Sequence, residues 1–225
     1  ILDPVLIISL VLVSAISLAS RNISYSLIRW PGDIFSIGSE GDYTSPTILR
    51  LDSEGAVVCQ QLLPFTRMLT LQYAADRNLM EDSFYLIGDQ YFNANQIDGK
   101  TRVLKNDSQC GIEWDVPVSS NIWSLSANAV LGGVYVTDRY DGVYRMEDDG
   151  NILWGPLDYG VTGGNFWTVV IDPTDGGAFV SEKQNSVVMK IDGAGNLKWS
   201  QTIPSPERLN PSLFDGGVYV GSGSY

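Results

Sequence analysis

The chain contains an internal repeat, and this repeat restricts the possible folds more than any other feature of the sequence. Its clearest copy is GGVYVTDRYDGVYRMEDDGNILW, and the next copy is GGAFVSEKQNSVVMKIDGAGNLKW. An upstream copy is longer, an earlier one is degenerate, and the last begins GGVYV and runs to the final residue. In chain order, the copies occupy residues 34–59, 83–114, 132–154, 176–199 and 216–225.

Each copy predicts short strands separated by Gly- and Asp-rich turns. In the clearest copy the expected strands are residues 133–137, 142–146 and 151–154, and an apolar stretch with aromatic residues precedes each copy. Four strands with a period of roughly 40 to 50 residues are typical of a β-propeller blade. We therefore expect a mainly β fold, with about four to five blades in a propeller domain over residues 31–225. Either the ends meet to close a small ring, or the native chain continues past Tyr225.

The copies end on a recurrent large residue. Trp114, Trp154 and Trp199 occupy this place, and Cys59 replaces the indole in the most degenerate copy. We expect the four side chains at equivalent buried positions between adjacent blades, in a structural role. Cys59 and Cys110 are the only cysteines and form no CxxC motif. They are either disulfide-bonded in an oxidising compartment or unpaired and buried.

The order of these elements resembles the PQQ-like (quinoprotein-type) propeller repeat: an apolar-Tyr-apolar strand, a second strand ending at Asp-x-x-Gly, then a Trp. The resemblance covers about residues 33–225. Quinoprotein dehydrogenases hold their cofactor between a Trp and a disulfide of adjacent cysteines, with calcium beside a catalytic Asp. This chain has no adjacent cysteines. We therefore expect no enzyme activity, catalytic residue, cofactor or metal.

Composition excludes further classes of function. The chain has no histidine, which removes His-based acid–base catalysis and the commonest transition-metal ligand. A formal net charge of −12 argues against nucleic acid as a partner. The acidic stretches at residues 138–142 and 147–151 fit tight turns better than calcium sites. Asn22 and Asn106 begin N-glycosylation sequons.

The first residues predict a different element. No charge occurs between Asp3 and Arg21, and Pro4 suits the first turn of a helix. We expect an α-helix over residues 1–30, apolar on every side, that is buried in lipid or in other helices. The residues expected to mediate its assembly are Pro4, Val5, Leu6, Ile8, Leu10, Val11, Val13, Ile16 and Leu18.

An N-terminus of this kind, with Asp-Pro-Val at residues 3–5, resembles the type IV pilin superfamily, especially its archaeal members. It departs from the bacterial pattern, because residue 1 is not Phe and residue 5 is not Glu. The resemblance implies an extracellular filament at the cell surface, with helices in its core and propellers outside. Its partners would be copies of the chain, with surface glycans or cell surfaces as adhesion targets and membrane insertion before assembly. The alternatives are a membrane-anchored propeller that acts as a binding scaffold and a truncated quinoprotein-type enzyme.

Overall fold

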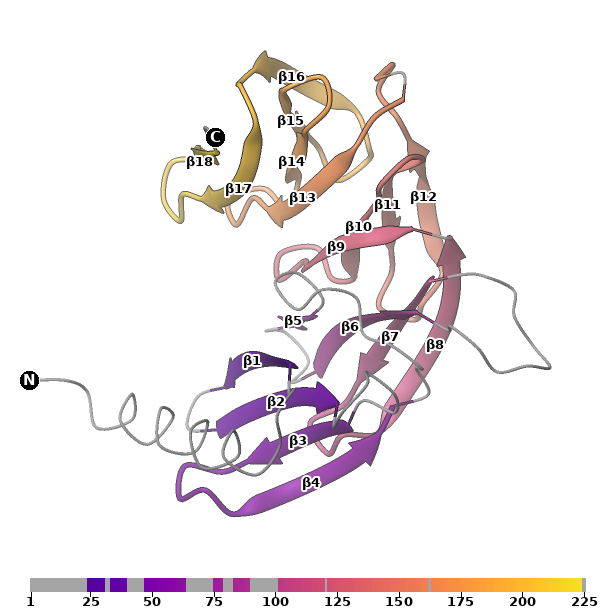
Figure 1. The fold of residues 1–225 in the computed structure, drawn as a ribbon, viewed down its shortest axis with the longest axis vertical. Coiled ribbons are helices and arrows are strands. Elements are labelled where there is room, and N and C mark those ends of the chain that lie inside the picture. The colour runs from indigo at the N-terminus through magenta and orange to yellow at the C-terminus, as the bar shows by residue number, and fades with distance from the viewer. Residues whose placement is uncertain are drawn as a thin grey trace, which may run out of the picture.

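The described part of the chain consists of strands and turns. A computed structural model describes residues 24–30, 33–39, 47–63, 75–78, 83–89, 101–119, 121–161 and 163–223. Within these ranges there is no helix, and hence none that would cross a membrane. The strands form five antiparallel sheets that follow one another along the chain and lie in an arc (Figure 1).

Each of the first two sheets has four strands in chain order. The first sheet comprises β1 (Ser24–Trp30), β2 (Asp33–Ser39), β3 (Thr47–Leu51) and β4 (Val57–Leu62). The second comprises β5 (Ala75–Asn78), β6 (Ser83–Asp89), β7 (Thr101–Asn106) and β8 (Ile112–Ser119).

The next two sheets repeat this order, whereas the fifth has two strands. The third sheet comprises β9 (Ile122–Ala127), β10 (Val134–Asp138), β11 (Gly142–Met146) and β12 (Ile152–Leu157). The fourth comprises β13 (Phe166–Ile171), β14 (Ala178–Glu182), β15 (Val187–Ile191) and β16 (Leu197–Thr202). The fifth comprises β17 (Pro206–Pro211) and β18 (Val218–Ser222).

These sheets resemble propeller blades, as the repeat predicts. The first strands of successive sheets are neighbours, and Figure 1 shows them on the inner side of the arc with the fourth strands outside. The middle strands are sandwiched between neighbouring sheets, so every residue of β10, β11 and β14 is buried. The outer strand β16 is exposed throughout. This layering explains why the middle strands are nearly continuous apolar runs, whereas the outer strands mix polar and apolar residues.

The core is divided between successive pairs of sheets. One apolar cluster lies at each of the four junctions, and the third is built around Tyr135, Phe166 and Met189. The cluster at the last junction has three fully buried members, Phe179, Val188 and Leu209. Each sheet therefore depends on its neighbours for burial, as in other repeat architectures.

The helix predicted over residues 1–30 is wrong for its last seven residues. Residues 24–30 form β1, which pairs with β2 in a continuous antiparallel register from Ser24↔Ser39 to Trp30↔Asp33. A short apolar segment does not distinguish helix from strand by its own pattern, and here the hydrogen bonds to β2 decide. Residues 1–23, including the predicted assembly residues from Pro4 to Leu18 and the sequon at Asn22, lie outside the described residues.

Two glycines provide a test of the close approach between strands. Gly133 and Gly160 have similar positive φ angles, 73° and 75°. A Cβ on Gly133 would lie 2.0 Å from the Met146 carbonyl oxygen, whereas a Cβ on Gly160 would meet nothing within 4 Å. We expect Gly160→Ala to lower the free energy of unfolding by about 1 kcal/mol, through backbone strain alone. Gly133→Ala should cost roughly 3–4 kcal/mol, because overpacking adds to that strain. Equal losses in urea unfolding would contradict this packing.

Candidate functional site

The predicted repeat residues lie at equivalent places on the fourth strands. Cys59, Trp114, Trp154 and Trp199 belong to β4, β8, β12 and β16. Each lies opposite a basic residue of the third strand, in the pairs Arg50↔Cys59, Lys105↔Trp114, Arg145↔Trp154 and Lys190↔Trp199. The cation in turn lies opposite an aromatic residue of the second strand, in the pairs Phe35↔Arg50, Tyr85↔Lys105, Tyr135↔Arg145 and Phe179↔Lys190.

Indole and cation reach the same atom of the following sheet. Trp154 Nε1 and Arg145 Nη1 both donate to the Gly193 carbonyl oxygen, at 3.1 and 2.7 Å. In the preceding junction Trp114 Nε1 and Lys105 Nζ both donate to the Asp148 carbonyl oxygen, at 2.7 and 3.4 Å. Both acceptors lie in the turn between the third and fourth strands. One turn carbonyl therefore fixes two side chains of the neighbouring sheet.

A glycine of the same turn lies directly against the indole. Gly150 and Gly195 both have a φ of 86°. A Cβ on Gly150 would lie 3.0 Å from Trp114, and one on Gly195 would lie 3.2 Å from Trp154. This turn, which reads Glu-x-x-Gly before Gly150 and Asp-x-x-Gly before Gly195, therefore needs glycine for two reasons, its left-handed backbone and its contact with the preceding sheet.

A disulfide replaces this contact at the first junction. Cys59 and Cys110 are bonded, which decides between the two alternatives that the sequence left open. Cys110 has a φ of 63° and occupies the turn position that Gly150 and Gly195 hold in later sheets. Arg50 Nη1 donates to the Ser108 carbonyl oxygen, as its counterparts do to Asp148 and Gly193. The covalent bond thus stands where indole and glycine meet elsewhere.

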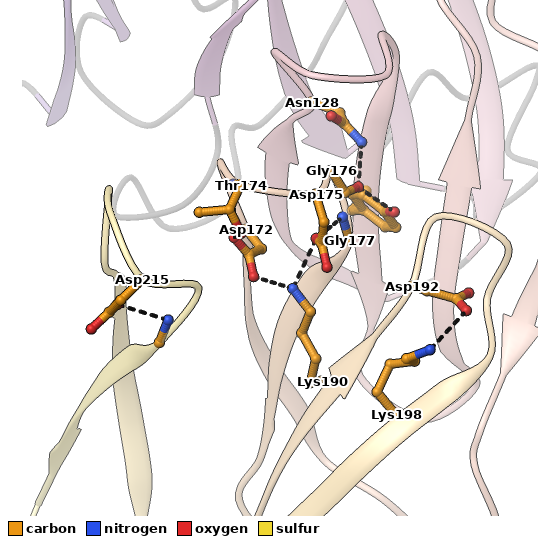
Figure 2. A network of polar contacts seen from close by, with 12 residues as sticks. Asn128, Asp172, Thr174, Asp175, Gly176, Gly177, Lys190, Asp192, Lys198 and Asp215 are labelled. Atoms are coloured by element: carbon orange, nitrogen blue, oxygen red, sulfur yellow. Dashed lines mark hydrogen bonds and ion pairs between the residues drawn. The ribbon is translucent and has the colours of Figure 1, made fainter.

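At the last junction the pattern is incomplete. Trp199 is 38% exposed, and its Nε1 has no acceptor among the described residues. The Lys190 ammonium is buried and donates to the carboxylates of Asp172 and Asp175 in its own sheet (Figure 2). Burial opposes ionisation of Asp172, but hydrogen bonds from Lys190 and Thr174 outweigh it and lower the pKa of this carboxyl group.

The acidic turns use their carboxylates internally. Asp192 accepts hydrogen bonds from the backbone N–H groups of Ala194 and Asn196, and Figure 2 shows Asp215 doing the same for Gly217. Among the described residues, no group of three or more His, Cys, Asp or Glu side chains is placed to hold a metal ion. The sequon residue Asn106 is fully buried at the end of β7, where a glycan has no room.

A different group of side chains lies on the inner strands β9 and β13 and on the loops beside them. Trp123 of β9 and Trp167 of β13 are half-buried neighbours, with ring centroids 4.7 Å apart. The Arg139 guanidinium carbon lies 5.4 Å from the ring centroids of both Trp123 and Tyr140. Lys183 Nζ lies 4.7 Å from the Trp167 centroid. These five residues form what we call the aromatic–cation cluster.

Two buried carboxylates hold the backbone of this cluster. Asp138 and Glu182, at equivalent ends of β10 and β14, are 1% and 0% exposed. Asp138 accepts hydrogen bonds from the backbone N–H groups of Asn121, Tyr140 and Asp141. Glu182 likewise accepts from Asn165, Gln184 and Asn185. The loops that carry Arg139 and Lys183 are therefore positioned before any ligand arrives.

The aromatic–cation cluster combines flat apolar surface with positive charge. Tyr140 is 57% exposed. Lys183 is paired with Glu207 at 2.7 Å, whereas Arg139 donates to Asn165 Oδ1 and has no carboxylate partner among the described residues. The sequence analysis missed this group, because it assigned the stretches around Trp123 and Trp167 to strands without a further role. Aligning the copies would have placed the two indoles, and Arg139 with Lys183, at matching positions.

Comparisons with known proteins show the fold. No protein-family model matches the chain, and no curated protein matches it in sequence. A streptogramin B lyase structure is similar over 87% of this chain and 61% of its own length, with 15% identity and a TM-score of 0.62. Virginiamycin B lyase from Staphylococcus aureus matches 88% of the chain with 13% identity and a TM-score of 0.58. The WD40 β-propeller domain of Doa1 matches 88% of it with 14% identity and a TM-score of 0.59.

These likenesses correct the predicted family. The similar structures named above include a β-propeller domain and no pilin, and the described residues contain no helix. The resemblance to type IV pilins is therefore wrong, and so is the predicted N-terminal helix over residues 24–30, the part of it that the structure describes. At such identities the likeness concerns the fold alone. The chain spans 61% of the length of both lyase structures that it matches.

A junction with the turn carbonyl and the last junction should differ in the free energy that is lost when the indole is removed. Trp154→Ala should lower the free energy of unfolding by roughly 3–5 kcal/mol, because it removes a packed ring and its hydrogen bond to Gly193. Trp199→Ala should cost about 1–2 kcal/mol, because this ring is partly exposed and lacks that acceptor. Urea unfolding followed by circular dichroism measures both, and equal losses would refute the difference between the junctions.

The disulfide predicts a redox-dependent stability. It joins cysteines separated by 51 residues, so replacing both by serine should cost about 4 kcal/mol by the chain-entropy model. Dithiothreitol should shift the wild-type unfolding midpoint to that of the double variant and leave the variant unchanged. A wild-type midpoint that ignores the reductant, or a thiol assay that detects free cysteines in the native chain, would contradict the bond.

Proposed function

We propose that this chain is a binding scaffold of the β-propeller type and that the aromatic–cation cluster receives a protein partner. The observation that carries the proposal is the composition of the cluster: the Arg139 guanidinium lies beside the rings of Trp123 and Tyr140, and the Trp167 ring packs against that of Trp123. Trp, Tyr and Arg are the residues that contribute most to binding energy at protein interfaces.

The charge of the cluster defines the partner further. The chain has a formal net charge of −12, but charges farther away than about 8 Å are largely screened at physiological ionic strength. Recognition therefore depends on the charged groups close to the cluster, where Lys183 is paired with Glu207 and Arg139 is the cation with no ion pair among the described residues. A segment with acidic and aromatic side chains would complement the cluster, because its carboxylates pair with Arg139 and its rings stack on the indoles.

The other functions considered have less support. The filament hypothesis depended on residues 1–23, which lie outside the described residues, and on the pilin resemblance, which is wrong. The expectation that the chain has no enzymatic activity stays a prediction, since two of the similar structures are lyases and their likeness concerns the fold alone. Cell-surface localisation also stays a prediction.

Selection of displayed random peptides on the intact chain tests the proposal. We expect the selected peptides to be enriched in Asp, Glu and aromatic residues. Arg139→Ala should weaken them by roughly 30-fold in Kd, which corresponds to about 2 kcal/mol. Lys198→Ala is the matched control, because Lys198 is an equally charged residue on the outer strand β16 and is 57% exposed.

The outcome that would contradict the proposal is equally direct. Peptides that bind wild type and Arg139→Ala alike, or lose affinity with Lys198→Ala instead, would place recognition elsewhere on the molecule. Neither Arg139 nor Lys198 belongs to the core clusters, so we expect both variants to keep their sheets. Circular dichroism of each variant checks this.

A further inference from the structure

A carboxylate takes the place of the indole in the third of three neighbouring inner strands. The strands β9, β13 and β17 lie in this order along the inner side of the arc (Figure 1). The second residue of each is Trp123, Trp167 and Glu207. The register of the sheets makes these places equivalent, through the pairs Ile122↔Asp138, Phe166↔Glu182 and Pro206↔Ser222.

The side chain of Glu207 reaches back to the preceding sheet. Its Oε1 lies 2.7 Å from Lys183 Nζ, and the two side chains are 28% and 32% exposed. The same ammonium group lies 4.7 Å from the centroid of the Trp167 ring. The Glu207 carboxylate therefore borders the half of the aromatic–cation cluster that Trp167 and Lys183 form, and it offsets the positive charge of that half.

A glycine leaves room for this carboxylate. Arg139 and Lys183 directly follow the second strands β10 and β14, and Gly223 is the residue that follows β18. A Cβ on Gly223 would lie 2.8 Å from Glu207 Cδ, which is closer than non-bonded carbon atoms pack. The fifth sheet thus has a carboxylate and a glycine where the third and fourth sheets have an indole and a cation.

We infer that Glu207 determines the charge specificity of the aromatic–cation cluster, an inference that rests on the proposed function. A carboxylate of the partner can pair with Arg139, which has no ion pair among the described residues. At Lys183 the same carboxylate would have to displace Glu207, which belongs to the same chain and loses no translational freedom when it pairs. The cluster therefore accepts a segment with one acidic side chain beside its aromatic residues, and it selects against a second acidic side chain at the Lys183 end.

Quenching of indole fluorescence by iodide measures the charge beside Trp167 without any peptide. Glu207→Gln is the test variant, because the amide keeps the size of the side chain and can still accept a hydrogen bond from Lys183, but carries no charge. The contribution of Trp167 is obtained by difference from the same proteins with the change Trp167→Phe. We expect its iodide quenching constant to rise about twofold in Glu207→Gln at constant ionic strength, and its quenching by neutral acrylamide to stay the same.

A second ion pair provides the matched control. Glu113, on the outer strand β8, lies 3.1 Å from Lys105 Nζ, and Glu113→Gln should leave both quenching constants of Trp167 unchanged. Equal iodide constants in wild type and Glu207→Gln would overturn the inference. So would a parallel rise with acrylamide, which would indicate greater access and not a change of charge, or the same rise in Glu113→Gln.

Peptide selection on the Glu207→Gln variant tests the specificity itself. We expect its peptides to carry a second acidic residue, and to bind Glu207→Gln up to about fivefold more tightly than wild type, as a newly available ion pair allows. Peptides with the same number of acidic residues from both proteins would overturn the inference. Failure of the proposed function has a different result, because peptide binding would then be insensitive to Arg139→Ala while the iodide difference at Trp167 remained.

Discussion

At each of the two middle junctions a single backbone carbonyl supports the arrangement of the sheets. The oxygen of Asp148, and then that of Gly193, accepts hydrogen bonds from both the indole and the cation of the preceding sheet. These donors are largely removed from water, so leaving them without an acceptor would cost more than the bonds themselves contribute. The contact sets the separation of neighbouring sheets, which in turn requires glycine in the turn and buries the middle strands. Tyr135 illustrates the result, because burial raises the pKa of its hydroxyl to about 12.

The contact between neighbouring sheets changes along the chain, and three kinds of junction can be distinguished. At the first junction a disulfide does what an indole and a glycine do later, and it occupies the same two positions. The middle junctions have the full set of contacts. The last one has the donors on one side and, within the described residues, no acceptor on the other. Repeat proteins derive their stability from such neighbour contacts, so the last junction is the weakest of the four within the described part of the chain.

Much of this architecture could be predicted from the sequence, because the repeat is local and periodic. The strands around Tyr135 and Phe179 and the alignment of Trp114, Trp154 and Trp199 follow from spacing alone. The secondary structure of residues 24–30 could not be predicted in this way, because it depends on their pairing with β2. The disulfide stayed undecided because Cys110 was not aligned with Gly150 and Gly195. The aromatic–cation cluster was not predicted because its residues belong to two sheets and lie together only in the folded chain.

Hydrogen exchange of the indole N–H groups, measured by NMR, tests most directly whether turn carbonyls hold the sheets together. The account predicts slow exchange for Trp114 and Trp154, whose N–H groups are bonded to Asp148 and Gly193 across a junction. It predicts fast exchange for Trp199, whose N–H group has no such acceptor among the described residues. If the three indoles exchange at the same rate, the contact does not distinguish the closed junctions from the open one, and the account is wrong.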